Sequence, residues 1–270
     1  MPLPPPVPVR VGGQEIATRV MGEGPPLVLI HGTPFSSHVW HRIAPVLAVR
    51  HRVYLYDLLG YGASAKPAGD VSLGVQNGVL AALFAHWQLD APGVIAHDFG
   101  GATALRAHLL DGLDYDRLLL IDPVALRPWG SAFVAHVKRH EAAFAGVPDY
   151  MQRALLAAYI RTSSHAGLTD AALDPYIAPW LGAEGQPAFY RQIAQMDMAY
   201  TDEVEPGYPG LRCPVRLIWG QEDQWIPLAA GERLAAMLPG CRLVRVPGAG
   251  HLVQEDAPEA ILAEALDMFG

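Results

Sequence analysis

The feature that most constrains this chain is a series of short apolar runs separated by longer amphipathic stretches. Each run is rich in Val, Leu and Ile and has only three to five residues, which is too short for a stable helix. Strands that are buried on both faces by crossover helices have this composition. The pattern therefore predicts a mostly parallel sheet with helices on both sides. The expected strands cover residues 27–30, 53–56, 94–96, 118–121, 215–219 and 243–246.

Two further segments extend this sheet at its edge. The segments 9–11 and 16–20 flank Gly12 and Gly13, and a glycine pair between Val-rich segments is typical of a tight antiparallel hairpin. With the hairpin, the sheet has about eight strands. Helices are expected from near Ser37, from near Ser72 as N-cap, over 100–110, over 227–238, and from Pro258 to the end.

Residues 123 to 205 break the alternation of strands and helices. This segment is rich in Ala, contains no convincing strand, and is punctuated by Pro148, Pro175, Pro179 and Pro187. We therefore predict an α/β core formed by residues 1–122 and 206–270. Residues 123–205 are predicted to form a helical cap inserted over the sheet.

Composition and charge argue against several classes of protein. Hydrophobic residues make up 51% of the 270 positions, which is enough apolar surface for a globular core. The formal net charge is −8 and no run of Lys or Arg is present, which argues against nucleic-acid binding. Cys213 and Cys241 form no CxxC pair, and no apolar run reaches the roughly 18 residues of a membrane span. We expect a cytoplasmic protein with no membrane partner.

A reactive side chain is expected directly after the strand 94–96. The sequence AHDFGG at 96–101 reads as a strand end, a sharp turn and a helix start. Small residues are needed around such an elbow because the turn brings strand and helix close together. Asp98 occupies the tip, and a carboxylate suits displacement at a saturated carbon better than attack on a carbonyl. The alternative is that Asp98 only caps the helix starting at Gly100. The reactive role is favoured because small residues flank Asp98 in the sequence.

Two further residues follow strands in the order expected of a catalytic triad. Asp223 and His251 lie on the loops after the last two expected strands. The carboxyl ends of parallel strands meet at one edge of a sheet, so both residues can approach Asp98. We predict that His251 is the general base and that Asp223 orients it. Asp122, after an earlier strand, is the alternative acid; Asp223 is favoured because its spacing to Pro227 matches the usual acid loop.

The loop HGTP at 31–34 follows the strand 27–30 and is expected to face Asp98. In sites built on such an elbow, a backbone N–H from this loop and the N–H after the nucleophile stabilise a negatively charged oxygen. Proline has no N–H, so Thr33 and Phe99 are the expected donors. A plain Gly-Thr-Pro turn is the alternative.

Three motifs resemble the haloalkane dehalogenase and epoxide hydrolase branch of the α/β-hydrolase superfamily. They are HGTPFSSHVW at 31–40, YDLLGYGAS at 56–64 and AHDFGG at 96–101. The resemblance covers nearly the whole chain outside the insertion. It implies an α/β-hydrolase fold with a helical cap and no cofactor. It also implies a reaction in which Asp98 displaces a leaving group from carbon to give an alkyl-enzyme ester, which water activated by His251 then hydrolyses.

The two activities of that branch differ in how the leaving group is held. Dehalogenases hold the halide with a Trp directly after the nucleophile, and with an Asn after the His-Gly pair or a second Trp from the cap. Phe99 and Thr33 stand at those positions here, and Phe has no N–H. The remaining candidate halide donors are Trp129 and Trp180. Phe99 and Ala102 also replace the two Arg of haloacid-type defluorinases, which disfavours small anionic substrates.

An epoxide leaves as an alkoxide, which is more basic than a halide and needs an acid such as a phenol. The resemblance implies that cap tyrosines supply it. The sequence AFYR at 188–191 resembles the second of these, so Tyr190 is the candidate donor, with simple packing as the alternative. The first tyrosine has no clean match, and His140 and Tyr150 are the candidates.

These residues predict epoxide hydrolysis to a diol. We expect the protein to be a monomer or a homodimer. Haloalkane dehalogenation is the first alternative, and a ligand-binding or non-hydrolytic role in the same fold is the second. The expected substrate is a small hydrophobic electrophile that reacts with water, without a cofactor or metal. His136 and His140 have the spacing of metal ligands on a helix, but no third ligand is evident. Four residues are expected to line the substrate pocket: His31, Pro34, Trp129 and Trp180.

Overall fold

The computed structural model describes residues 2–270, and its centre is one eight-stranded sheet. The strand order is β1-β2-β4-β3-β5-β6-β7-β8. Only the pairs β1–β2 and β2–β4 are antiparallel, and all other neighbouring strands are parallel. The predicted mostly parallel sheet with an edge hairpin is confirmed. The strands are β1 (Val7–Val11), β2 (Gln14–Met21), β3 (Pro26–Ile30), β4 (Arg52–Tyr56), β5 (Gly93–His97), β6 (Leu118–Ile121), β7 (Val215–Gly220) and β8 (Arg242–Val246).

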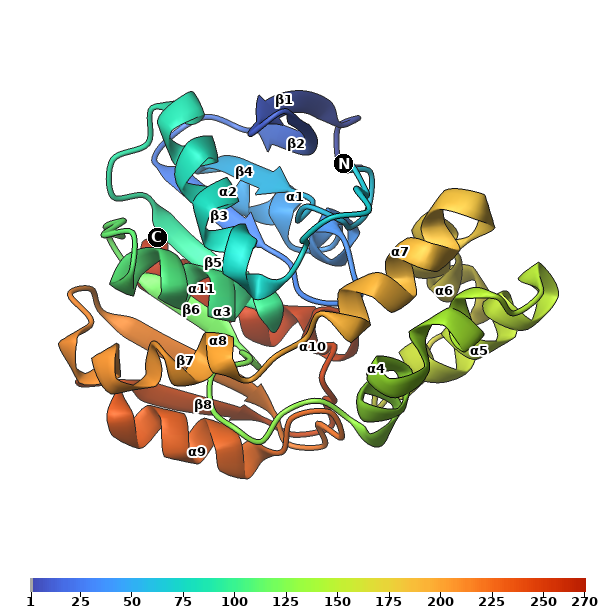
Figure 1. Cartoon of the computed structure of the whole chain (residues 1–270). Coiled ribbons are helices and arrows are strands. Elements are labelled where there is room, and N and C mark those ends of the chain that lie inside the picture. Colours follow the sequence, from blue (N-terminus) through green and yellow to red (C-terminus); the bar gives the residue numbers. More distant parts are fainter. Residues whose placement is uncertain (1) are drawn as a thin grey trace.

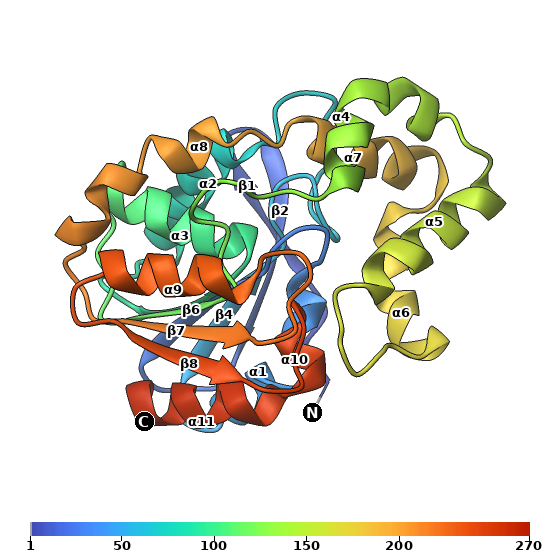
Figure 2. The same ribbon diagram turned by 90° about the horizontal axis from the view of Figure 1, so that it is seen from below.

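Helices cover both faces of the sheet, which explains why the central strands are apolar throughout. Every residue of β5 and β6 is buried. Figure 2 shows α2 (Leu73–Trp87), α3 (Phe99–Leu109) and α9 (Leu228–Met237) on one face. On the other face lie α1 (Ala44–Leu47), which follows the short η1 (Ser37–Trp40), and α11 (Pro258–Phe269), which follows α10 (Val253–Asp256).

Local sequence signals place the ends of these helices. The hydroxyl of Ser72 accepts a hydrogen bond from the Gly74 amide at 3.2 Å, so Ser72 is the N-cap of α2, as predicted. Pro258 is the first residue of α11, a position where the missing N–H has no partner to lose. Among the helices of residues 2–270, none combines the length and apolar composition that crossing a bilayer requires.

The segment between β6 and β7, which we call the helical insertion, contains helices and no strand within the described residues. Its elements are α4 (Ala132–Ala145), α5 (Asp149–Arg161), α6 (Asp170–Ile177), η2 (Ala178–Trp180), α7 (Gly182–Ala194), α8 (Ala199–Asp202) and η3 (Glu205–Gly210). Figure 1 shows α4 to α7 as a group beside the sheet, whereas α8 lies over the core. The arrowheads of β7 and β8 point toward that group (Figure 2). A division into separate domains at residues 123 and 205 stays a prediction.

Candidate active site

Asp98 stands at the sharp turn between β5 and α3. Its φ is +52°, in a region that residues other than glycine rarely adopt and that is often found at functional sites. The turn needs small neighbours: a Cβ atom on Gly100 would lie 2.4 Å from the carbonyl oxygen of Ile30, and one on Gly101 would lie 2.5 Å from Cβ of Pro123. The Asp98 side chain makes no capping hydrogen bond to α3. The interpretation of Asp98 as a simple helix cap therefore does not hold.

The structure brings Asp98, His251 and Asp223 together at the carboxyl ends of β5, β8 and β7. Nδ1 of His251 lies 2.8 Å from Oδ2 of Asp223, and Nε2 lies 3.4 Å from Oδ2 of Asp98. The first distance is a hydrogen bond, whereas the second suits an ion pair and is too long for a good hydrogen bond. Oδ1 of Asp223 accepts hydrogen bonds from the amides of Trp225 and Ile226 at 2.7 and 2.9 Å. These bonds fix the carboxylate that orients the imidazole.

The two carboxylates control the charge of His251. Burial lowers the pKa of His251, but the charge and hydrogen bond of Asp223, together with Asp98, outweigh burial and raise the pKa well above its ordinary value. At neutral pH the imidazole is therefore protonated in the free protein and lies between two carboxylates. The ring has no exposed surface, so little solvent screens these charges.

Asp122, the alternative triad acid, is also buried but does not bind His251. Its Oδ1 accepts a hydrogen bond from the Gly220 amide at 2.9 Å, and its Oδ2 has no partner among residues 2–270. Burial, with a smaller contribution from Asp223, raises the pKa of Asp122 well above its usual range. Burial thus favours the protonated form of Asp122, and Asp223 is the carboxylate that contacts the imidazole.

One of the two predicted oxyanion donors points at Asp98. The Thr33 amide donates to Oδ1 of Asp98 at 2.7 Å. Gly32 permits this approach, because a Cβ atom there would lie 2.3 Å from Cβ of Asp98. Within residues 2–270 the Phe99 amide makes no hydrogen bond to the Asp98 side chain, although Phe99 lines the pocket. Its role as the second donor stays a prediction.

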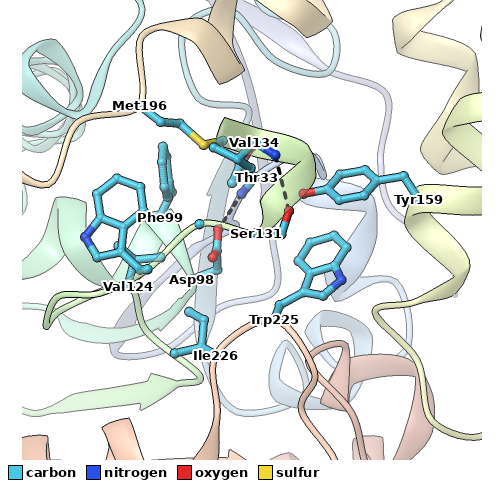
Figure 3. A pocket seen from close by; sticks show the side chains of 12 residues that line it. Thr33, Asp98, Phe99, Val124, Ser131, Val134, Tyr159, Met196, Trp225 and Ile226 are labelled. Carbon is cyan, nitrogen blue, oxygen red and sulfur yellow. Dashed lines mark hydrogen bonds between the residues drawn. The ribbon is translucent and has the colours of Figure 1, made fainter. Parts of the chain in front are cut away.

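A small, mostly apolar cavity lies in front of Asp98 (Figure 3). Its volume is about 30 Å³, room for two or three water molecules at most. The ring of Trp225 stacks on His251 with 5.0 Å between the ring centroids and on Tyr159 with 4.7 Å. The walls include Thr33, Phe99, Val124, Trp129, Tyr159 and Trp225.

Of the four predicted pocket residues, only Trp129 lines this cavity. His31 is buried below the loop, where its Nε2 accepts from the Leu58 amide at 2.9 Å. The indole N–H of Trp180 donates to the carbonyl oxygen of Pro34 at 2.7 Å. The assignment of His31, Pro34 and Trp180 to the pocket is therefore corrected: these residues hold the loop and do not face the cavity.

The indole N–H of Trp129 is also engaged by the protein. It donates to Oγ1 of Thr201 at 2.9 Å, although its ring faces the cavity. The N–H of Trp180, the other candidate halide donor, is bonded to Pro34. Neither indole therefore offers an unused N–H to a halide.

The three predicted leaving-group donors do not reach the cavity. The hydroxyl of Tyr190 donates to Oε1 of Gln152 at 2.5 Å in the interior of the helical insertion. Burial there raises the pKa of Tyr190 to about 12. Tyr150 is 78% exposed, and His140 is exposed on α4. The geometry therefore does not support these three assignments, because Tyr190 bonds within the insertion and the other two side chains face solvent.

Tyr159 of α5 is the phenol that the sequence did not indicate. It lines the cavity, and its hydroxyl points inward beside Ser131 (Figure 3). Burial, and then the charges of Asp98 and Tyr61, raise the pKa of Tyr159 above its ordinary value. The hydroxyl therefore keeps its proton and acts as a hydrogen-bond donor. No local motif marks Tyr159, because its position follows only from how α5 packs over the sheet.

His97 is a second residue whose role was not anticipated. Its Nε2 lies 3.0 Å from the carbonyl oxygen of His251. Burial, and then the charge of His251, lower the pKa of His97 to about 3, so its ring is neutral and can donate through Nε2–H. This contact holds the backbone of the loop that carries His251.

The two histidines with metal-ligand spacing lie on the exposed face of α4. The ring centroids of His136 and His140 are 4.8 Å apart. Among residues 2–270 no group of three or more His, Cys, Asp or Glu side chains is arranged to bind a metal ion.

Comparison with known proteins places this geometry in a family. Residues 27–265 match the alpha/beta hydrolase family. The haloalkane dehalogenase 2 of Mycobacterium tuberculosis is 28% identical over 92% of this chain and 89% of its own length. The soluble epoxide hydrolase of Corynebacterium sp. is 28% identical over 96% of this chain and 95% of its own.

Comparison with solved structures gives the same family as comparison of sequences. The crystal structure of an alpha/beta hydrolase fold protein from Burkholderia ambifaria superposes with a TM-score of 0.97 at 55% sequence identity, covering 99% of both chains. The family match begins at the second residue of β3 and includes β4 to β8 and the loops that carry Asp98, Asp223 and His251. The chain belongs to the alpha/beta hydrolase family.

Proposed function

We propose that this protein is a cofactor-free hydrolase that forms an alkyl-enzyme ester on Asp98 and that its substrates are epoxides. The observation that carries the proposal is the environment of the Asp98 carboxylate. Oδ1 is held by the Thr33 amide at 2.7 Å, and Oδ2 lies 3.4 Å from His251. One oxygen is thus bound as an oxyanion would be, and the other accepts no hydrogen bond from residues 2–270 and can attack.

In the first step, Oδ2 of Asp98 attacks an epoxide carbon and the carbon–oxygen bond of the ring breaks. The electron pair goes to the departing oxygen, which takes a hydrogen bond and then a proton from an acid in the pocket. Tyr159 is the candidate acid because its phenol lines the same cavity as Asp98. The product of this step is a hydroxyalkyl ester, in which Oδ1 is the carbonyl oxygen.

Before the second step, His251 gives up the proton it carries in the free protein, and this proton replaces the one that Tyr159 donated. The neutral His251 then removes a proton from water, and the hydroxide attacks Cγ of Asp98. The negative charge that develops on Oδ1 is stabilised by the Thr33 amide, with Phe99 as the proposed second donor. The Cγ–Oδ2 bond then breaks, and the diol leaves with Oδ2 and with the proton that His251 took from water. The oxygen of the water remains in Asp98, whose carboxyl group returns its proton to His251. Asp223 holds the imidazole in the orientation that this proton transfer needs.

Two observations favour an epoxide over a haloalkane. An alkoxide needs a proton donor, and the cavity presents a phenol. A halide needs N–H donors, and the N–H groups of Trp129 and Trp180 already bind Thr201 and Pro34. Because a haloalkane dehalogenase is among the relatives, dehalogenation is the alternative activity to be tested.

A paired assay on epoxides and bromoalkanes tests the proposal, using Tyr159→Phe with Tyr190→Phe as the matched control. We expect diol formation to fall roughly 10- to 100-fold in Tyr159→Phe, because the acid is lost, and to stay close to wild type in Tyr190→Phe. Halide release faster than diol formation would reverse the order of the two activities. No turnover on either series would favour a ligand-binding role.

A further inference from the structure

Two buried side chains of the helical insertion bond to the loop at residues 31–34, which we call the oxyanion loop. Trp180 bonds to Pro34, and Gln192 bonds to Thr33, the residue whose amide contacts Asp98. We propose that Gln192 of α7 is a positioning residue, which holds Thr33 so that its amide points at Oδ1 of Asp98. The inference rests on the proposed function, because Thr33 is given its role by the chemistry at Asp98.

Two hydrogen bonds that share Thr33 link Gln192 to Asp98. Its Oε1 accepts hydrogen bonds from Oγ1 of Thr33 and from the hydroxyl of Tyr61, both at 2.8 Å. The amide of the same Thr33 donates to Asp98 at 2.7 Å. Thr33 is thus bound at its side chain by the insertion and at its backbone to the nucleophile. A displacement of Gln192 therefore changes the direction of the Thr33 N–H.

Packing alone does not explain a glutamine at this position. Gln192 is 2% exposed, and its Nε2 has no hydrogen-bond partner among residues 2–270. Exchanging the nitrogen and oxygen positions of the amide would not help, because the atom facing away from the two hydroxyls would still be unpaired. A buried amide with half of its hydrogen-bonding capacity unused destabilises the fold relative to an apolar side chain of similar size. A residue kept at such a cost is expected to serve the site.

A second glutamine on the same helix shows what a purely structural role looks like. Nε2 of Gln186 donates to the carbonyl oxygens of Ala145 and Val147 at 3.0 and 2.6 Å. These bonds tie α7 to the end of α4, and they involve no residue of the cavity. Gln186 therefore provides a matched control for Gln192.

The kinetic test compares Gln192→Leu with Gln186→Leu during a single turnover of an epoxide, followed by rapid quenching. The charge on Oδ1 develops when water attacks the ester, so ester hydrolysis should slow more than ester formation. We expect hydrolysis to be roughly 10- to 100-fold slower in Gln192→Leu, without a lower Tm. Gln186→Leu should show the opposite pattern, with a lower Tm and hydrolysis within about 2-fold of wild type. Hydrolysis within about 2-fold of wild type in Gln192→Leu would overturn the proposal.

Hydrogen exchange provides a readout that needs no turnover. The peptide containing residues 31–36 should exchange faster in Gln192→Leu than in wild type and should be unchanged in Gln186→Leu. Unchanged exchange in Gln192→Leu would overturn the positioning role whatever reaction the site performs. Failure to trap any ester in the wild type would instead refute the proposed function, and exchange alone would then decide the role of Gln192.

Discussion

Oδ2 of Asp98 and Nε2 of His251 lie 3.4 Å apart, and the two side chains have almost no contact with solvent. A carboxylate and an imidazolium at this distance attract each other strongly in a medium with little water. The charge of Asp98 therefore helps to keep His251 protonated in the free protein. Formation of an ester on Asp98 would remove that charge, and the pKa of His251 would fall. The proton that His251 then releases replaces the one that Tyr159 gave to the alkoxide, so the proposed first step leaves the neutral base that the second step needs.

Because of this contact, the pKa of His251 in the free protein should be higher than the pKa that governs hydrolysis of the ester. In the free protein, Asp98 and Asp223 both raise the pKa, so titration of the imidazole resonance by NMR should report a value well above the ordinary one. Ester hydrolysis in single turnover should follow a lower apparent pKa, because only Asp223 then remains charged. Hydrolysis that follows the same pKa as the free protein would contradict this coupling.

The two buried acids beside His251 should respond differently to the same substitution. Asp223→Asn removes the carboxylate that orients His251 at 2.8 Å and should lower kcat roughly 10²- to 10⁴-fold. Asp122 makes no bond to His251, so Asp122→Asn should change kcat by less than about 3-fold. A larger loss in Asp122→Asn than in Asp223→Asn would mean that the acid is wrongly assigned.

Asp122 should instead affect stability, with a definite dependence on pH. The pKa of Asp122 is raised in the folded state, chiefly by burial. Above the ordinary pKa of an aspartate, this side chain therefore ionises more readily in the unfolded chain than in the folded protein. The free energy of unfolding is therefore lowered progressively as pH rises above about 3.9. Asparagine cannot ionise, so the Tm of Asp122→Asn minus that of wild type should increase from pH 4 to pH 7. A difference in Tm that stays constant from pH 4 to pH 7 would contradict this dependence.

Gly32 tests how closely the oxyanion loop must approach Asp98. In Gly32→Ala the new Cβ would lie 2.3 Å from Cβ of Asp98, so the loop or the nucleophile must move. We expect a loss of roughly 1–3 kcal/mol in the free energy of unfolding and at least about 10²-fold in kcat. Gly78→Ala is the control, because Gly78 lies on an exposed face of α2 and no atom lies within 4 Å of a Cβ built there. This substitution should raise the free energy of unfolding by about 0.5–1 kcal/mol. Unchanged kcat in Gly32→Ala would argue against a fixed loop.

The sequence was most informative where a residue's position follows from a strand end. Asp98, Asp223, His251 and Thr33 each follow a strand, and the carboxyl ends of parallel strands bring such residues together whatever the loops do. The strand pattern itself was readable because helices bury both faces of β5 and β6.

Residues on the helical insertion could not be placed in the same way. Tyr190 lies in a sequence that resembles the family's cap-tyrosine motif, yet its hydroxyl bonds to Gln152. Tyr159 lies in no such motif, yet it lines the cavity. The packing of the helices on each other decides which face of α5 or α7 lies over Asp98. Successive residues of a helix are rotated by about 100°, so neighbouring positions can face the pocket or be buried elsewhere. The role of Gln192 was hidden for the same reason.

In the proposed mechanism Asp98 bonds covalently to substrate carbon and is then released by water. A single turnover of an epoxide in ¹⁸O-labelled water, followed by mass spectrometry of the peptide containing Asp98, distinguishes this route from direct attack by water. The mechanism predicts one labelled oxygen in the Asp98 carboxylate and none in the diol formed in that turnover. A labelled diol with an unlabelled Asp98 would show that water attacks the substrate directly, and would contradict the account.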